Sequence, residues 1–267
     1  MTSNDLRTFL NLVLPLAQPL VGAMPQLFGI GHTQAEMSAR SQTAVVPEGY
    51  AFSIWGVLFA LSIAWGIWQV LPSGGKDSLI ARRLGWPLAG AFGASILWML
   101  LSQTTENGWH LVLVILLVLA GSLAAFFINR NLTQAQGAQG WPERWIIRPL
   151  VGMLAGWVSV ATFVNIAGAS LLSGAIQAEG TAGTVAAVLI LLAAGGFTLG
   201  VLWAARGSPW YAVAVAWGLG GILYANTLGR DFNLIVAVVA GALMIVVVAM
   251  AWQRRRLASG GMVASRP

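Results

Sequence analysis

The side chains of this sequence best suited to hold a small molecule are tryptophans that lie deep within long apolar stretches. Trp55, Trp98, Trp157 and Trp217 are of this kind. An indole offers a broad face for stacking and one N–H group that needs a partner inside hydrocarbon. Together with a few neutral amides, such residues suit a pocket for a large, flat, mostly apolar ligand. The alternative is that these rings fill the core of a helix bundle, and composition alone leaves both interpretations open.

Conventional catalytic and metal chemistry has little support in the sequence. Cysteine is absent, which excludes disulfides, thiolate catalysis and Cys-rich metal sites. The two histidines, His32 and His110, are too few for a histidine metal cluster. Apart from Arg148 at the start of one apolar stretch, these stretches hold no Asp, Glu, Lys or Arg near their middle. We therefore expect no metal site, no catalytic residues, no ion-coupled pump and no required cofactor.

The composition is that of an integral membrane protein. Of 267 residues, 58% are hydrophobic and 8% charged, and the mean hydropathy is +0.78, whereas roughly a quarter of a soluble domain is charged. The net charge of +6 comes from residues in the loops between apolar stretches, as membrane topology requires. We therefore expect the lipid bilayer as a partner and no nucleic acid.

Eight stretches approach the roughly 20 mostly apolar residues that a helix needs to cross a bilayer. Breakers and charges, such as "LPSGGKDS" and "RGSP", separate them. The predicted fold class is therefore all-α: a polytopic membrane protein of about eight transmembrane helices. The predicted spans are 8–29, 50–71, 85–103, 109–128, 147–172, 183–204, 209–227 and 233–252.

The distribution of Lys and Arg predicts the orientation of the chain. With the N-terminus inside, the inner segments hold 12 of these residues and the outer segments hold two, Arg40 and Arg230. The positive-inside rule then places both termini in the cytoplasm, in a bacterial-type inner membrane. The first span could pass for a signal peptide. We favour a retained helix, because Asn11 and Gln18 interrupt its apolar run and no clear cleavage site follows.

Small residues predict where helices approach closely. The run "GMLAG" contains a Gly152-x-x-x-Gly156 step, which is typical of tight contacts between membrane helices. We therefore expect the fifth span to pack tightly and to confine its Trp157. Six other tryptophans lie near span ends, where indoles anchor at the headgroups: Trp86, Trp109, Trp141, Trp145, Trp210 and Trp252.

Two stretches resemble the signatures of a known membrane family. In "VPEGYAFSIWGVLF", Pro47, Phe52, Trp55, Leu58 and Phe59 match the proline-led loop and aromatic-Trp pattern of the second helix of the TspO/MBR family. This family is also known as the tryptophan-rich sensory proteins or the translocator protein family. The stretch "GWVSVATFVN", residues 156–165, is similar to its fifth-helix signature of Trp, then Ala-Thr, then Asn. Between these two, "ILWMLLSQTTENGWHLVLVILLVLAG" resembles the third and fourth helices.

The resemblance implies a five-helix bundle, often dimeric, whose pocket opens under the first outer loop. Members bind tetrapyrroles such as protoporphyrin, and sterols in eukaryotes. Carried over by position, the ligand-binding residues are Trp55, Trp98, Trp157, Ala161 and Asn165. The last three are spaced i, i+4 and i+8, so they form a stripe on one helix face.

The first outer loop permits two interpretations. Its polar residues His32, Glu36, Arg40 and Glu48 belong either to a lid over the pocket or to a plain solvated loop.

The resemblance ends near residue 173, which predicts two regions. Residues 1–173 are expected to form a TspO-like five-helix membrane bundle. Residues 174–267 are expected to form an additional three-helix region with a basic C-terminal tail, without a counterpart in the five-helix family.

The predicted function is non-catalytic binding, sensing or passage of a hydrophobic planar ligand, such as a porphyrin or another tetrapyrrole. Three alternatives stay open: a transporter or permease that uses the extra helices, a porphyrin-modifying enzyme that relies on indole photochemistry, and an assembly partner without a pocket. A homodimer is a further open interpretation.

The second span raises a question that sequence leaves unanswered. Trp65 and Trp68 approach its inner end, where packing or interface anchoring explains them. Trp55 lies near its outer end, beneath the loop that contains Pro47. The question is whether Trp55 and Trp157 face the same cavity.

Overall fold

All regular structure in the described part of the chain is helical, which confirms the predicted fold class. The computed structural model describes residues 2–33, 36–37, 42–71, 75–105, 108–137, 140–229 and 232–263. Arg40 and Arg230, on which the orientation count depends, lie outside these residues. The long helices are α1 (Ser3–Gly22), α4 (Ile54–Val70), α5 (Leu79–Thr104), α6 (Trp109–Gln136), α8 (Arg148–Leu172), α9 (Gly180–Ala204), α10 (Pro209–Ala225) and α11 (Leu234–Val263). The short elements are α2 (Met24–Phe28), the 3₁₀ turn η1 (Gly49–Ser53), α7 (Gly140–Pro142) and the π-helical turn η2 (Glu143–Ile147).

Each of the eight predicted spans falls on one of the long helices. Within the described residues, six helical segments are long and apolar enough to cross a membrane: Gly49–Val70, Leu79–Thr104, Trp109–Gln136, Gly140–Leu172, Gly180–Ala204 and Leu234–Leu257. Helix α10 is apolar but has 17 residues, which spans about 25 Å, less than the bilayer core. Helix α1 is not among the six, because polar residues such as Asn11 and Gln18 interrupt its apolar run. The chain is an all-α polytopic membrane protein.

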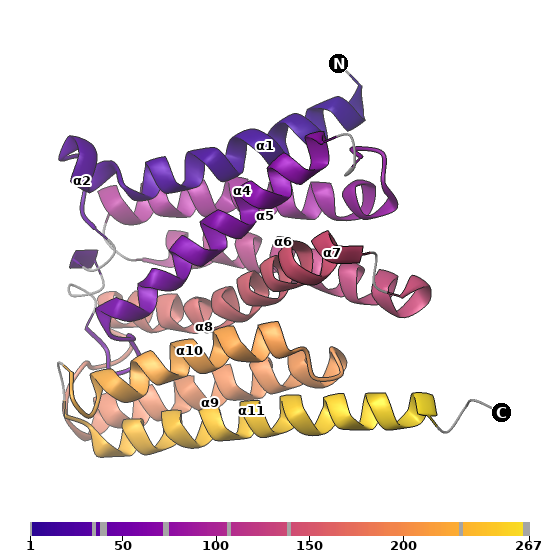
Figure 1. Cartoon of the computed structure of the whole chain (residues 1–267). Coiled ribbons are helices and arrows are strands. Elements are labelled where there is room, and N and C mark those ends of the chain that lie inside the picture. The colour runs from indigo at the N-terminus through magenta and orange to yellow at the C-terminus, as the bar shows by residue number, and fades with distance from the viewer. Residues whose placement is uncertain are drawn as a thin grey trace.

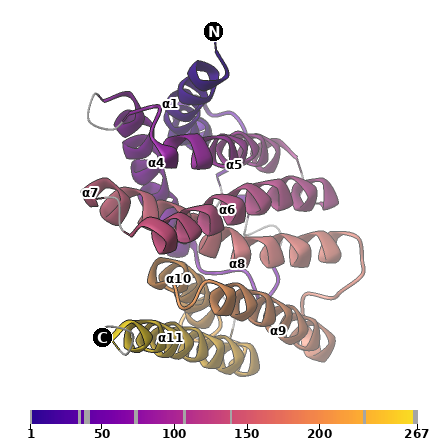
Figure 2. The same ribbon diagram turned by 90° about the vertical axis from the view of Figure 1, so that its right-hand side faces the viewer.

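The long helices lie side by side, and successive ones run in opposite directions (Figure 1). Helix α1 begins and α11 ends at the same end of the bundle, which we call the terminal end. Helix α5 packs between α1 and α6, and α8 packs between α6 and α10. Figure 2 shows α9, α10 and α11 together on the far side of α8 from α1, α4 and α5. Helix α8 is therefore central and is buried along most of its length.

Two glycines of α8 let α10 approach its backbone. A Cβ atom on Gly152 would lie 2.7 Å from the Cβ of Trp210, and one on Gly156 would lie 2.5 Å from the carbonyl oxygen of Tyr211. Both distances are too short for a side chain, so the expected tight packing at the Gly-x-x-x-Gly step is confirmed. The buried hydroxyl of Tyr211 also donates a hydrogen bond of 2.9 Å to Ser159 Oγ.

Helix α1 is bonded to its neighbours through Asn11. The Nδ2 of Asn11 donates to the carbonyl oxygen of Gly85 in α5 at 2.7 Å, and Trp65 Nε1 in α4 donates to Asn11 Oδ1 at 2.8 Å. Trp65 is fully buried, so it serves packing, not interface anchoring. The Trp65 ring also stacks on the Trp68 ring, with centroids 5.5 Å apart.

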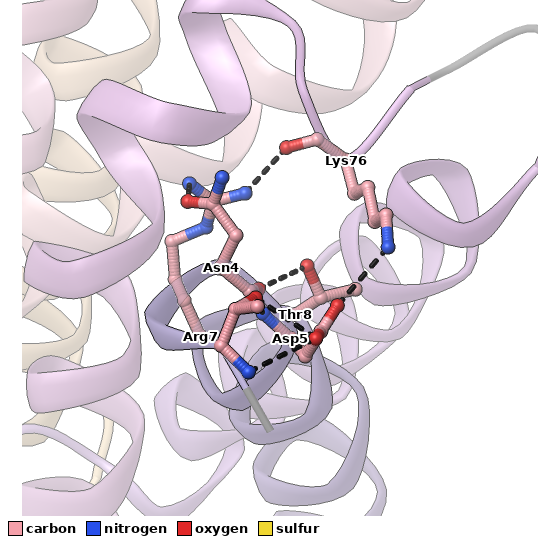
Figure 3. A network of polar contacts seen from close by, with 6 residues as sticks. Asn4, Asp5, Arg7, Thr8 and Lys76 are labelled. Carbon is pink, nitrogen blue, oxygen red and sulfur yellow. Dashed lines mark hydrogen bonds and ion pairs between the residues drawn. The ribbon is translucent and has the colours of Figure 1, made fainter.

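The first turn of α1 carries a polar network at the terminal end (Figure 3). Lys76 Nζ lies 3.0 Å from Asp5 Oδ1. The guanidinium of Arg7 donates to Asn4 Oδ1 and to the carbonyl oxygen of Lys76. Arg7 is buried, and Gly85 leaves room for its side chain. These contacts tie α1 to the loop that precedes α5.

Candidate functional site

A cavity lies between α4, α5, α6 and α8, at the end of the bundle opposite the termini. Its volume is about 60 Å³. We call this end the cavity end. All five predicted ligand-binding residues line the cavity together. The described lining residues are Met37, Val46, Pro47, Phe52, Trp55, Trp98, Ser102, Leu111, Ile115, Trp157, Val160, Ala161, Val164 and Asn165.

Helix α8 supplies one wall of the cavity from a single face. Trp157, Ala161 and Asn165 follow one another at intervals of four residues, and Val160 and Val164 lie beside them. The predicted stripe is therefore present and faces the cavity. Ala161 has the smallest side chain of the five, so it leaves free space between Trp157 and Asn165.

The tryptophans of α4 and α8 form an aromatic corner. The ring of Trp157 lies edge-on to Trp55, with centroids 6.4 Å apart, and edge-on to Phe52 at 6.0 Å. Trp55 in turn stacks on Phe59 at 5.7 Å. Edge-to-face and offset-stacked rings are the favoured aromatic geometries. Trp55 and Trp157 therefore face the same cavity, and Phe52 forms part of the same corner.

A hydrogen bond between α5 and α8 fixes the third indole. Trp98 Nε1 donates to Asn165 Oδ1 at 3.1 Å, and Asn165 Nδ2 donates to the carbonyl oxygen of Ala161 at 2.8 Å. Each polar atom of the Asn165 side chain thus has a protein partner. In this structure Asn165 supports the Trp98 ring at the cavity wall.

The indole N–H of Trp157, unlike that of Trp98, is not hydrogen-bonded to any described residue. Trp157 is buried, and within the described part of the chain its Nε1 has no hydrogen-bond partner. A buried donor without a partner costs about 1–3 kcal/mol. None of the described lining residues is ionisable, so the described part of the cavity wall is neutral. It presents aromatic faces, aliphatic side chains and a small number of polar groups.

The part of the cavity wall that precedes α4 was not predicted as part of the site. Met37, Val46, Pro47 and Phe52 contribute to it. Pro47 and Phe52 belong to the stretch that resembles the family signature, so that stretch could have identified them. No sequence signal distinguishes Met37 or Val46 from other apolar loop residues.

The remaining lining residues also escaped prediction. Val160 and Val164 share a face with Trp157 and follow from helical spacing. Leu111 and Ile115 of α6 lie in an apolar run of similar residues, which does not reveal which face is turned inward. Ser102 stands one turn beyond Trp98 in α5.

The polar residues of the first outer loop do not line the cavity where they are described. His32 donates its backbone N–H to the carbonyl oxygen of Gln103, and its Nδ1 lies 3.9 Å from Glu36 Oε2. Arg40 lies outside the described residues, and Glu48 packs beside Gly229 after α10. The lid interpretation stays a prediction. Among the described residues of this loop, those that line the cavity are apolar.

Trp217 does not belong to the cavity, although its position deep in a predicted span is similar to that of the other three indoles. It is 40% exposed on α10, and its Nε1 donates to the carbonyl oxygen of Ala51 at 2.8 Å. The indoles expected at span ends include Trp86, Trp109, Trp141, Trp145 and Trp252, which are exposed.

The fold and the cavity define a class: a helical, polytopic membrane protein with a cavity lined by tryptophans and, among the described residues, by no ionisable group. Comparison with protein families narrows this class. The family model described as TSPO-like protein matches residues 8–252, and the chain belongs to this family. The match continues through α9, α10 and most of α11, the region predicted to be additional. Comparison with curated proteins and with solved structures gives no significant match.

Proposed function

We propose that this protein binds a hydrophobic, planar molecule, such as a tetrapyrrole, in the cavity between α4, α5, α6 and α8. Binding serves sensing or passage of the ligand, without catalysis. The ligand lies against Trp55, Trp98 and Trp157, whose rings offer broad apolar surface. Membership of the TSPO-like family and the convergence of five family-matched residues on one cavity support this proposal.

The unpaired N–H of Trp157 is the observation that carries the proposal. This N–H group is buried, and the described lining contains no ionisable group that would compete with it for an acceptor atom of the ligand. A ligand with an acceptor atom at its edge would satisfy this donor and remove the cost of leaving it unpaired. Van der Waals contact and stacking then supply affinity, while this one hydrogen bond supplies orientation.

The cavity must widen when such a ligand binds. A volume of about 60 Å³ has room for a few water molecules, and a macrocycle needs several times more. Helices α5 and α6 pack closely on each other, as do α6 and α8. We therefore propose that the loop side of the cavity, formed by Val46, Pro47 and Phe52, yields to admit the ligand.

Quenching of tryptophan fluorescence by a porphyrin tests this function. Trp157→Ala removes both a stacking face and the free donor, so we expect the apparent dissociation constant to rise about tenfold or more. Trp252→Ala is the matched control: it removes an exposed indole at the terminal end and leaves the cavity intact. Its dissociation constant should stay within about twofold of wild type. Equal effects of the two substitutions would contradict the assignment.

A ligand screen then defines the chemical class. Purified protein is titrated with a tetrapyrrole, a sterol and a carotenoid, each read by the same fluorescence quenching or by thermal stabilisation. A ligand present at a hundred times its dissociation constant stabilises the folded state by about 2.7 kcal/mol. We expect the tetrapyrrole to give the largest shift, and Trp157→Ala to abolish most of it.

A further inference from the structure

Helix α10 forms hydrogen bonds with the segment that closes the cavity. We call residues 44–53 the roof segment. The backbone N–H of Glu48 donates to the carbonyl oxygen of Gly221 at 3.1 Å, and Trp217 Nε1 donates to the carbonyl oxygen of Ala51 at 2.8 Å. These bonds join parts of the chain more than 160 residues apart. They connect the region that follows α8 to the loop that precedes α4.

Two further contacts extend this attachment along α10. Asn226 Nδ2 donates to the carbonyl oxygen of Ala44 at 2.8 Å. Gly221 lets the roof segment lie directly on the helix, because a Cβ atom there would come within 2.8 Å of Ala51 Cβ and 2.9 Å of Pro47 Cβ. The roof segment therefore packs closely on α10 at Gly221, and side-chain hydrogen bonds hold it at Ala44 and at Ala51.

Aromatic rings cover the outer edge of the same contact. Tyr50 packs edge-on against Trp217 at 5.6 Å and edge-on against Tyr224 at 5.5 Å. Both partners belong to α10, each about one turn from Gly221 and on opposite sides of it along the helix. These two edge-on contacts hold the Tyr50 ring against α10.

The opposite side of the roof segment faces the cavity. Val46, Pro47 and Phe52 line it, and the Phe52 ring packs against Trp157. Pro47 thus contacts α10 through its Cβ and also lines the cavity. A movement of the roof segment that admits a large ligand must therefore loosen its contacts with α10.

We propose that α10 anchors the roof of the cavity, with Trp217 and Asn226 as positioning residues, and thereby sets how fast a ligand enters and leaves. This gives the region after α8 a part in ligand binding, although none of its described residues lines the cavity. The kinetic part of this inference rests on the proposed function, whereas the anchoring part does not.

Hydrogen exchange of the ligand-free protein tests the anchoring. The amide of Glu48 is a direct probe, because α10 accepts its hydrogen bond. Trp217→Phe keeps an aromatic side chain and removes the hydrogen bond to Ala51, so exchange in residues 44–53 should become about fivefold faster. Trp203→Phe removes an exposed indole at the opposite end of the bundle and should leave this exchange unchanged. Equal exchange in Trp217→Phe and wild type overturns the anchoring.

Stopped-flow porphyrin quenching tests the kinetic consequence. In Trp217→Phe the association and dissociation rates should both rise about fivefold, while the dissociation constant changes much less, because the cavity lining is intact. Faster exchange with unchanged rates overturns the gating role. If Trp217→Phe does not fold, Asn226→Ala serves as the second variant. It removes the hydrogen bond to Ala44 and should change exchange and rates in the same direction. Absence of quenching in wild type overturns the proposed function, and the exchange experiment still decides the anchoring.

Discussion

At the scale of single residues, the Trp98–Asn165 hydrogen bond is the polar contact that holds one cavity wall. It joins α5 to α8 over 3.1 Å in a buried setting. Asn165→Leu keeps the branched shape of the side chain but leaves the indole N–H unpaired, which should cost about 1–2 kcal/mol of unfolding free energy. Chemical or thermal unfolding in detergent measures this loss.

A double-mutant cycle isolates that bond from packing. Trp98→Phe in the wild-type background removes the donor, whereas in the Asn165→Leu background the donor has already lost its partner. We expect Trp98→Phe to cost less unfolding free energy in the Asn165→Leu background than in wild type. The difference should be about 0.5–1 kcal/mol, the usual range for polar pairs between membrane helices. Additive costs would show that the bond contributes nothing to stability.

The Asp5–Lys76 ion pair predicts a dependence of stability on pH. Hydrogen bonds from Lys76 and Thr2 lower the pKa of Asp5 from its ordinary 3.8 to about 2, and the bond to Asp5 raises the pKa of Lys76. A carboxyl with a lowered pKa stabilises the fold above its ordinary pKa, and this contribution is lost as the pH falls from about 4 to 2. The lysine contribution is lost only as the pH rises above its raised pKa.

Melting temperatures of wild type and Lys76→Ala test that sign. Lys76→Ala should lower the melting temperature slightly at pH 7, because both charges are exposed and screened. The difference should shrink as the pH falls from 4 to 2. Arg83→Ala, which removes an exposed charge near the start of α5 and keeps the pair, should show no such convergence. A difference that is constant with pH would contradict the role of the pair.

At the scale of helices, the contact between α8 and α10 depends on missing side chains. A Cβ atom on Gly156 would lie 2.5 Å from the carbonyl oxygen of Tyr211 and 3.1 Å from Ala214. Gly156→Ala should therefore force the helices apart and cost about 1–3 kcal/mol. Unfolding in detergent measures the cost.

Gly196 provides the control for that substitution. It lies inside α9, and a Cβ atom there would meet no atom within 4 Å. Gly196→Ala should be neutral or stabilise the protein by up to about 1 kcal/mol, because alanine favours the helix. If the two substitutions behave alike, close approach of α8 and α10 does not determine stability.

The helices themselves follow from sequence because hydropathy and breakers are local signals. Every predicted span overlaps a long helix, and the spacing of Trp157, Ala161 and Asn165 placed these residues on one face. The attachment of Trp217 to Ala51 did not follow, because it joins residues 166 positions apart. No local pattern encodes such a pairing. The cavity wall from Val46 and Met37 was missed for the same reason.

Local sequence patterns also did not predict the short elements that precede helix α8. The apolar run that we assigned from residue 147 begins structurally with α7 and the π-helical turn η2. In that turn the buried Glu143 accepts hydrogen bonds from Arg148 Nε at 3.2 Å and from the Thr133 hydroxyl. A buried carboxylate with these partners is a tertiary feature, so the sequence left Glu143 between the predicted spans 109–128 and 147–172.

At the scale of the whole molecule, the described lysine and arginine residues and the cavity lie at opposite ends. The polar network of Arg7 and Lys76 lies at the terminal end, as do Arg254 and Arg256, whose guanidinium groups stack on Trp203 and Trp252 at 3.6 and 3.5 Å. The cavity and its roof lie at the other end. From the positive-inside rule we predict that the terminal end faces the cytoplasm and that a ligand would reach the cavity from the outer side. This orientation remains our prediction.

Labelling of single cysteines tests the orientation, since the chain has no cysteine of its own. Gln177 is exposed in the loop after α8, at the cavity end, and Ala135 is exposed near the end of α6, at the terminal end. In intact cells, a membrane-impermeant maleimide should label Gln177→Cys and spare Ala135→Cys. Both variants should react equally after the membrane is permeabilised, which controls for accessibility. The reverse pattern in intact cells would place the cavity on the cytoplasmic side, and its ligand would then have to come from within the cell.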